Sequence, residues 1–205
     1  MYNPSDFKKD DSSKLFDFIE KNSFGILVSQ KEGKLEAAHL PVLAQPDFGA
    51  QGGLLSHMAK ANPQWNSLAG QEVMMIFQGP HAYISPSWYG TLESVPTWNY
   101  VSVHAYGCFI PIMDEGEISE ILHKMVGFYE GALPQPWDMG KLPEDYFKKL
   151  LKMVVGFRIE ISRLEGKWKL GQNHKVEKRE RVVRALEQGG YHSKEVAKLM
   201  KEEMK

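Results

Sequence analysis

A short segment of the sequence, SHMAKANPQW at residues 56–65, combines hydrogen-bond donors with a positive charge. Ser56 and His57 can donate hydrogen bonds, and Lys60 carries an ammonium group. Asn62 before a proline is typical of a helix start, where free backbone N–H groups and the helix dipole attract anions. The segment therefore predicts a phosphate site made by these four residues. A solvated lysine in a loop is the alternative for Lys60.

A second candidate region, residues 73–113, is rich in aromatic side chains and almost free of charge. Its 41 residues hold eight of the 23 aromatic residues of the chain and one charged residue, Glu93. Its prolines and polar groups argue against a membrane span. Because interfaces favour Tyr and Trp over Lys and Glu, the region indicates a ligand site or a subunit interface, with cover by the protein's own helices as the alternative. The residues singled out are Trp88, Tyr89, Trp98, Asn99 and Tyr100.

The alternation along residues 99–109 shows which face of this region is unusual. One face carries apolar residues and predicts an ordinary core: Val101, Val103, Ala105 and Phe109. The other face is polar but uncharged: Tyr100, Ser102, His104, Tyr106 and Cys108. By contrast, the strand expected at residues 157–163 alternates apolar residues with Arg158, Glu160 and Ser162, as a solvated face does.

Familiar catalytic and metal-binding motifs are missing from the sequence. It contains no GxxxxGK[ST] phosphate loop, no GxGxxG turn, no GxSxG elbow and no HExxH helix. The seven histidines are not spaced to place two of them on one metal from one element, so no metal site is predicted. Cys108 is the single cysteine, which excludes an internal disulfide, and we interpret it as a packing residue.

The hydrophobic spacing predicts how these segments are arranged. Two strands, at residues 24–30 and 34–43, are expected to form a hairpin. Helical stripes are expected at residues 12–19, capped by Ser12 or Ser13, and at residues 118–129 and 142–154. Because strands come in hairpins rather than alternating with helices, the sequence favours a mainly β fold with helices, an antiparallel barrel or sandwich.

The end of the chain differs in charge from the rest. Residues 173–205 contain nine Lys or Arg and six Asp or Glu, a net charge of +3, against 16 and 20, a net charge of −4, for residues 1–172. Two helices around Gly189 and Gly190 are predicted, the second capped by Ser193. We therefore expect a domain at 1–172 and a helical extension at 173–205. A helix-turn-helix DNA reader is one interpretation, and a solvated helical hairpin is the alternative, because Glu residues are interspersed among the cations.

Length and composition limit the possible classes of protein. A chain of 205 residues with 42% hydrophobic residues fits one folded domain, or one with a short appendage. Its net charge of −1 provides no global field for holding a polyanion or an anionic membrane. The N-terminal segment has no apolar core typical of a signal peptide, and no run of about 18 apolar residues occurs. We therefore expect a cytoplasmic protein.

Four segments together resemble a known family. They are SHMAKANPQW (56–65), IFQGPHAYISPSWY (76–89), VPTWNYVSVHAYG (95–107) and KLGQN (169–173), and they resemble the PaiB family of FMN-binding negative transcriptional regulators. The resemblance implies an FMN-binding split barrel, an antiparallel six-stranded Greek-key barrel, usually a homodimer with flavin at the subunit interface. This chain departs from the family pattern at one position. The family is expected to have KLSQN in the last segment, and here Gly171 stands where Ser is usual.

A flavin suits the candidate residues. Its phosphate needs cations or amide protons, which the segment around Lys60 offers, and its ring needs flat faces and hydrogen-bond donors. Trp88, Tyr89, Trp98 and Tyr100 can flank the ring and Asn99 can bond its polar edge, but the same aromatic residues can instead seal a dimer interface. The rivals to a flavin-binding regulator are a flavin oxidoreductase, a haem-binding or haem-degrading split barrel with a histidine axial ligand, and a DNA-binding module formed by the C-terminal helices.

Overall fold

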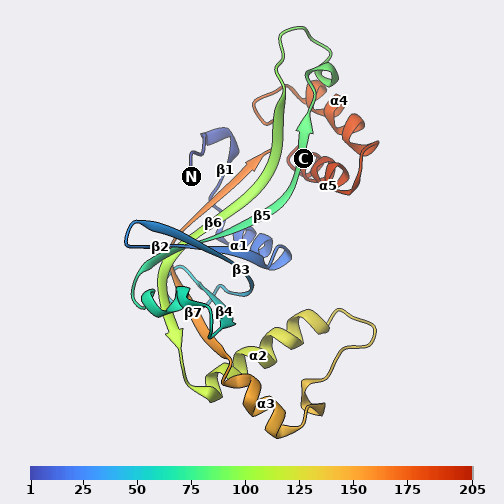
Figure 1. Cartoon of the computed structure of the whole chain (residues 1–205). Helices are drawn as coiled ribbons and strands as arrows, with labels where there is room; N and C mark the ends of the chain where they lie inside the picture. Colours follow the sequence, from blue (N-terminus) through green and yellow to red (C-terminus); the bar gives the residue numbers. More distant parts are fainter. Residues whose placement is uncertain (205) are drawn as a thin grey trace. The chain divides into compact units, whose positions relative to one another are not determined.

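The structure is a computed structural model and describes residues 1–204 (Figure 1). Its strands are β1 (Lys8–Lys9), β2 (Phe24–Lys31), β3 (Lys34–Gln45), β4 (Gly53–Ala59), β5 (Glu72–Ile84), β6 (Thr97–Ile112) and β7 (Val154–Lys169). Its α-helices are α1 (Ser12–Lys21), α2 (Glu115–Glu130), α3 (Glu144–Leu151), α4 (Val176–Glu187) and α5 (Tyr191–Glu202). Four short 3₁₀ helices are η1 (Ser5–Phe7), η2 (Pro63–Ser67), η3 (Pro86–Tyr89) and η4 (Met139–Lys141).

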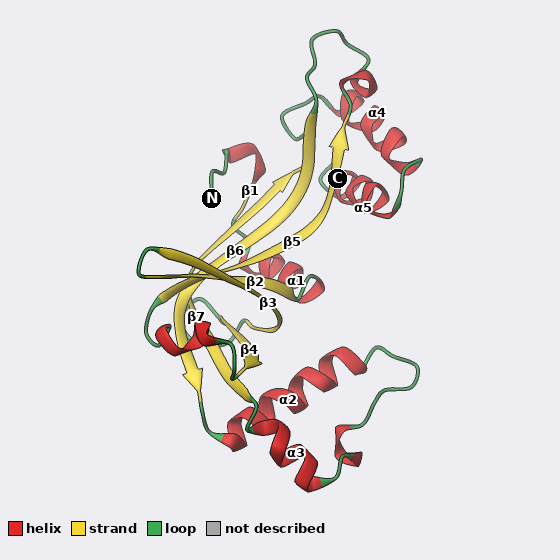
Figure 2. Ribbon diagram, in the orientation of Figure 1, coloured by secondary structure: helices red, strands yellow, loops and turns green. Residues whose placement is uncertain are grey.

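The strands form one sheet in the hydrogen-bonded order β1-β7-β4-β3-β2-β5-β6. An additional pairing of β7 with β6 closes six of these strands into a ring, with the two-residue β1 beside β7 as the seventh strand. The pairs β1–β7, β2–β3, β2–β5, β3–β4 and β4–β7 are antiparallel. The predicted six-stranded antiparallel barrel, mainly β with helices, is therefore confirmed (Figure 2).

The described chain divides into two compact units. Within the described residues, the first unit comprises residues 1–18, 78–104 and 165–204, and the second comprises residues 19–77 and 105–164. The long strands β5, β6 and β7 contribute residues to both units. The first unit also holds α4 and α5, whereas the second holds β2, β3, β4, α2 and α3. Each unit is described separately below.

The second unit has an apolar core inside its strands and a smaller cluster under its helices. Phe109 of β6 and Phe157 of β7 are fully buried and stack with ring centroids 4.7 Å apart. α2 and α3 lie side by side (Figure 2). They bury an apolar cluster against the β4 residue Leu55, made of Ile112, Ile118, Ile121, Met125 and Leu151. Of these residues, Ile118, Ile121 and Met125 belong to α2, and their spacing of three and four positions places them on one face of the helix.

The first unit has its own core. Phe18 packs edge-on against Trp168, with ring centroids 5.1 Å apart. The helices α4 and α5 pack as a hairpin beside η3 (Figure 1). Their buried apolar residues are Val182, Val183, Leu186, Val196, Ala197 and Met200. The C-terminal helices are therefore packed elements of this unit, and the boundary expected at residue 172 stays a prediction.

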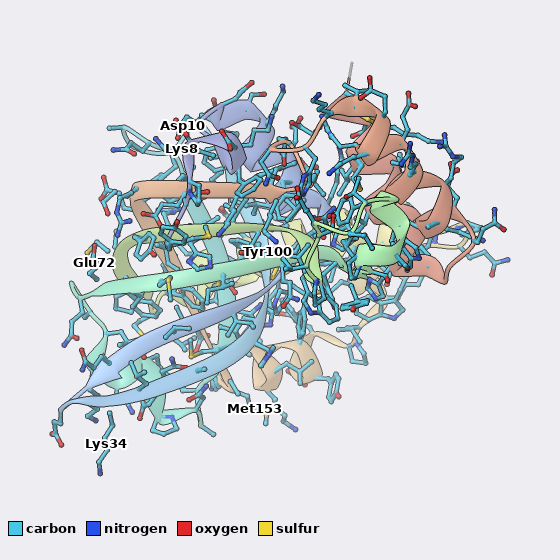
Figure 3. The ribbon with its side chains drawn as sticks, turned by 90° about the horizontal axis from the view of Figure 1, so that it is seen from above. Lys8, Asp10, Lys34, Glu72, Tyr100 and Met153 are labelled. Carbon is cyan, nitrogen blue, oxygen red and sulfur yellow. The ribbon has the colours of Figure 1, made fainter. Side chains whose placement is uncertain are left out.

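Most of the expected elements are present. The hairpin is formed by β2 and β3, with Lys34 at its turn end (Figure 3). The core face of β6 is confirmed, since Val101, Val103, Ala105 and Phe109 are fully buried. The helix expected at 142–154 ends at Leu151, because Val154 already begins β7.

The predicted helix caps were wrong at two places. The first helix is capped by Asp11, whose carboxylate accepts a bond from the Lys14 backbone N–H, rather than by Ser12 or Ser13. Ser193 lies inside α5, which starts at Tyr191 after Gly190 and has no side-chain cap. In both cases the helix begins earlier than its apolar stripe, so the stripe alone misplaces the cap.

We predict that Gly107 is required for the close approach of β6 and β7. A Cβ atom at Gly107 would lie 2.2 Å from the carbonyl oxygen of Glu160, a backbone atom that cannot turn away. Gly107→Ala should lower the free energy of unfolding by about 1–3 kcal/mol. Chemical denaturation of both proteins measures this change.

The matched control is Gly127→Ala in α2, where a Cβ atom would meet nothing within 4 Å. Alanine is the better helix former, so this variant should raise the free energy of unfolding by about 0.5–1 kcal/mol. If Gly107→Ala were as stable as the original protein, the strands would not approach as closely as described.

Candidate functional site

Two of the predicted phosphate residues lie on β4 in the second unit, and both side chains already have partners. Ser56 is fully buried, and its hydroxyl donates a 2.6 Å hydrogen bond to the carbonyl oxygen of Pro41 on β3. Nδ1 of His57 lies 3.1 Å from the sulfur of Met125 on α2. Burial lowers the pKa of His57, which favours a neutral imidazole. The Ser56 proton is therefore used within the protein, and His57 is packed beneath α2.

Lys60 follows directly after β4, and its backbone fixes the loop. Its N–H donates to the carbonyl oxygen of Met153 at 2.8 Å, and its own carbonyl accepts from the indole N–H of Trp65 at 3.0 Å. Its side chain is exposed. Within residues 1–204 no carboxylate pairs with it. The ammonium group of Lys60 is thus a cation available to a ligand.

Asn62 caps η2 as the sequence predicts. Its side-chain oxygen accepts a 3.0 Å hydrogen bond from the backbone N–H of Gln64, and Pro63 follows at the first helical position. The same bond uses one of the N–H groups that was expected to be free for a phosphate. Gln64 is itself buried and donates to the hydroxyl of Ser29 at 2.9 Å, which ties η2 to β2.

The predicted aromatic residues lie in the first unit. Trp88 and Tyr89 are on η3, whose start is capped by the hydroxyl of Ser85 and whose end is Gly90 with φ of 66°. A Cβ at Gly90 would collide with the guanidinium of Arg181, which donates to the carbonyl oxygen of Tyr89 at 3.0 Å. Glycine at this position therefore allows α4 to hold η3.

The remaining predicted residues follow one another at the start of β6. Trp98 is 53% exposed, and its ring meets that of Tyr83 edge-on at 6.0 Å. Asn99 is buried, and its amide nitrogen lies 3.4 Å from the sulfur of Met200 on α5. Tyr100 is half-buried on β6, with the ammonium of Lys167 5.5 Å from its ring centre (Figure 3).

A cavity of about 350 Å³ lies in the first unit. Its apolar wall includes Phe7, Tyr89 and Val95. Its polar lining is formed by Glu93, Ser94, Thr97, Asn99, Lys169, Asn173 and His174, and Gly171 completes it. Tyr89 and Asn99 both line this cavity, whereas Trp88, Trp98 and Tyr100 do not line it. Ser56, His57, Lys60 and Asn62 belong to the second unit.

The loop after β7 gives the cavity its polar groups. The side chain of Gln172 accepts from the N–H of Leu170 at 2.8 Å and donates to the carbonyl of Trp168 at 2.6 Å. Gly171 has φ of 81°, a left-handed conformation that favours glycine over the serine expected there. This turn presents Asn173 and His174 to the cavity.

Lys169 and His174 are two titratable groups of the cavity lining that the sequence analysis did not assign to a site. The ammonium of Lys169 donates to the hydroxyl of Thr97 and, at 2.7 Å, to the carbonyl of Trp98. Burial, and then Lys167, lower its pKa. Burial, then Lys178 and Lys169, lower the pKa of His174. In the sequence, Lys169 belongs to the KLGQN segment. That segment contributed to the family resemblance, but the resemblance assigned no role to the lysine.

Tyr89 links this polar loop to η3. Its ring lies 4.8 Å from the ring of His174, and burial raises the pKa of its hydroxyl. Within residues 1–204 no group of three or more His, Cys, Asp or Glu could hold a metal ion. The cavity can therefore bind through hydrogen bonds, one ammonium group and apolar contact.

Comparison with known proteins identifies the class. Residues 1–163 match the family described as "Putative FMN-binding domain". The chain is 36% identical over 212 residues to the Bacillus subtilis protein named "Protease synthase and sporulation protein PAI 2", covering 100% of this chain and 99% of that one. It is 31% identical to an uncharacterized protein of Aspergillus fumigatus, covering 84% and 85% of the two chains.

Solved structures share the fold. The FAD and heme binding protein from Mycobacterium smegmatis aligns with a TM-score of 0.60 at 14% identity, covering 90% of this chain and 80% of that one. The flavocytochrome Anf3 from Azotobacter vinelandii aligns with a TM-score of 0.58 at 15% identity, covering 84% and 74%. The protein is a flavin-binding split barrel. It belongs to the "Putative FMN-binding domain" family and is similar over its full length to the PAI 2 protein, as the resemblance to PaiB implied.

Within residues 1–204, no helix is both long and apolar enough to cross a membrane. The expected cytoplasmic location stays a prediction.

Proposed function

We propose that the protein is a homodimeric FMN-binding regulator in which Lys60 binds the phosphate of FMN. The observation that carries the proposal is the exposed Lys60 ammonium, without a carboxylate partner in residues 1–204, inside the range that matches the FMN-binding family. FMN supplies electron-transfer chemistry when bound. The role of this chain is to hold the phosphate by charge and to cover the ring with aromatic side chains.

The contacts proposed for the flavin ring are the aromatic residues of the first unit and Asn99. Of these, Trp98 exposes half of its surface and so can meet a ligand or a second subunit without rearrangement. Tyr89 is buried and bonded through its backbone to Arg181. Trp88, Tyr89, Trp98, Asn99 and Tyr100 remain predicted ring contacts, and the experiment on Lys60 does not depend on them.

One observation supports haem as the alternative ligand, because the FAD and heme binding protein from Mycobacterium smegmatis shares the fold. An absorption spectrum of the protein purified without added cofactor separates the two ligands, since flavin bands and a haem Soret band differ. A haem spectrum would turn the proposal toward a haem-binding split barrel.

We predict that Lys60→Ala weakens FMN binding by roughly ten- to a hundredfold, because it removes a charge-assisted contact. Titration of the flavin fluorescence measures the affinity. The matched control is Lys34→Ala, which removes another exposed lysine of the second unit, at the turn of the β2–β3 hairpin. Equal affinities for the original protein and both variants would place the phosphate elsewhere.

The homodimer is proposed to bury the exposed apolar surface within residues 81–106. That surface includes Tyr83, 46% exposed, Trp98, 53% exposed, and Val95, 74% exposed. A stable dimer should bury more than about 1,200 Å² in total. Exposed Tyr and Trp side chains, such as Tyr83 and Trp98 with their rings in edge-to-face contact, are typical anchors of such an interface.

We predict that light scattering at micromolar concentration gives about twice the chain mass of 23.4 kDa. Trp98→Arg should raise the dissociation constant of the dimer by at least about tenfold, because a buried aromatic anchor is replaced by a charge. Trp137→Arg is the control, since Trp137 is similarly exposed at 49% but lies in the second unit. A monomer at all concentrations, or an equal effect of both variants, would refute this interface.

Regulation is proposed to be mainly indirect, because the C-terminal helices offer few free cations. The basic residues between positions 175 and 198 are the candidate DNA contacts: Lys175, Lys178, Arg179, Arg181, Arg184, Lys194 and Lys198. Arg179 is 6% exposed, so it is excluded as a direct DNA contact. Arg181 bonds the Tyr89 carbonyl, and Lys178 bonds Thr91. Lys194 and Lys198 lie next to Lys201, whose charge is paired with Glu187.

We predict weak DNA binding with little sequence preference. If three lysines contact phosphates, affinity should fall by about 40-fold between about 50 and about 200 mM salt. A gel-shift series with the original protein and the triple variant Lys175→Gln, Lys194→Gln, Lys198→Gln tests this, with Lys34→Gln as a control. Tight, sequence-specific DNA binding by the triple variant would show that these lysines are not the DNA contacts. It would also contradict the proposal that regulation is indirect.

A further inference from the structure

We propose that the cavity in the first unit is a binding site for a small organic anion, with its carboxylate or phosphate on Lys169 and its apolar body against Phe7, Tyr89 and Val95. The cavity lies in the first unit, and Lys60 lies in the second. Because Tyr89 and Asn99 are also proposed ring contacts, competition with FMN tests whether the two ligands share this cavity. The proposal rests on the cavity and its charges and does not require the protein to bind FMN.

The first argument is the state of the Lys169 side chain. An ammonium group has three N–H donors, and two of them are used by the Thr97 hydroxyl and the Trp98 carbonyl. These bonds hold the charge at the cavity wall and leave one donor for a ligand. Within residues 1–204 no carboxylate forms an ion pair with Lys169. A partly buried ammonium without an anion gains free energy when one binds.

The second argument is the charge of the surrounding wall. Lys167 and Lys178 act electrostatically on Lys169 and His174 respectively, and both add positive potential. The single acidic residue in the cavity lining is Glu93, which is exposed. Cations therefore outnumber acids around the cavity, which selects for an anionic ligand over a neutral or cationic one.

The third argument is the buried arginine behind Gly171. Arg179 is 6% exposed, and its Nε has no hydrogen-bond partner in the described chain. Its one hydrogen bond is long, 3.5 Å from Nη2 to the carbonyl of Met200. Its Cγ lies 3.9 Å from where a Cβ of Gly171 would stand, and Gly171 lines the cavity. This guanidinium adds positive charge behind the Gly171 turn, and the carboxylate of Glu203 acts electrostatically on it.

The lining also sets the size and shape of the ligand. About 350 Å³ accommodates a ring or a short chain with one acidic group. Phe7, Tyr89 and Val95 give apolar contact, while Asn99, Asn173 and His174 give hydrogen-bonding groups. The chemical class is therefore an aromatic or branched carboxylate or a phosphate monoester. Benzoate and phenyl phosphate are the probes for the two anionic groups, and benzyl alcohol is the uncharged probe of similar size.

The experiment is calorimetric titration of the full chain with each probe, with and without added FMN. We expect benzoate or phenyl phosphate to bind with saturation and benzyl alcohol to bind at least about tenfold more weakly, because the charge-assisted contact is missing. Whichever anion binds more tightly identifies the acidic group. Saturation by neither anion would overturn the proposal, as would equal binding of benzyl alcohol.

Two variants tie the binding to this cavity. Lys169→Met keeps the aliphatic stem and removes the charge, so anion affinity should fall at least about tenfold, whereas Lys175→Met, an exposed lysine outside the lining, should leave it unchanged. Val95→Trp fills the cavity from an exposed loop position and keeps Lys169, so it should abolish binding without loss of the fold.

Unchanged anion affinity in both cavity variants would refute the placement. Displacement of the bound anion by FMN would show that the cavity belongs to the flavin site and would overturn its separate role. The Lys60→Ala titration reports on the flavin site alone, so failure of one proposal is distinguishable from failure of the other.

Discussion

The pairing of β6 with β7 is the constraint on which the rest of the structure depends. It closes the ring of six strands, and it brings the strand backbones so close at Gly107 that a Cβ atom would lie 2.2 Å from the Glu160 carbonyl oxygen. The same pair of strands brings Lys169, at the end of β7, to Thr97 and Trp98, at the start of β6. Closure and the charged wall of the cavity therefore come from one strand pair. A barrel removes its sheet edges by such pairing, and here it also positions an ammonium group.

The sequence predicted the elements better than the side-chain contacts. The β2–β3 hairpin, the alternating face of β6 and the Asn62 cap follow from local rules of turn, pleat and capping, and all three are present. Ser56 shows why the site was harder to predict. Its hydroxyl bonds the carbonyl of Pro41 on the neighbouring strand, which depends on the β3–β4 register and on burial. No spacing within SHMAKANPQW carries that information.

The same reasoning explains the missed residues. The alternation rule was applied to the middle of β6, whereas the cavity forms where β6 begins and where the loop after β7 turns. That turn is built by the side chain of Gln172 and by the left-handed backbone of Gly171. A serine at Gly171 would have room, since its Cβ would meet neighbours at 3.8–4.0 Å, but its backbone conformation would be strained. The departure from KLSQN therefore reflects backbone geometry and removes a hydroxyl from the lining.

The two lysines proposed to bind anions, Lys60 and Lys169, differ in the structural evidence for anion binding. Lys60 is exposed, and an exposed ammonium without a partner costs almost nothing, so its availability alone says little and family membership supplies most of the argument. Lys169 is partly buried and close to Lys167, and both of these facts carry a free-energy cost that an anion would offset. Its two hydrogen bonds to neutral groups hold the ammonium at the cavity wall. A fold that maintains such an unmatched cation beside a cavity is organised around a ligand of opposite charge. For this reason the strongest physical indication of binding in the chain lies in the KLGQN loop, outside the family match over residues 1–163.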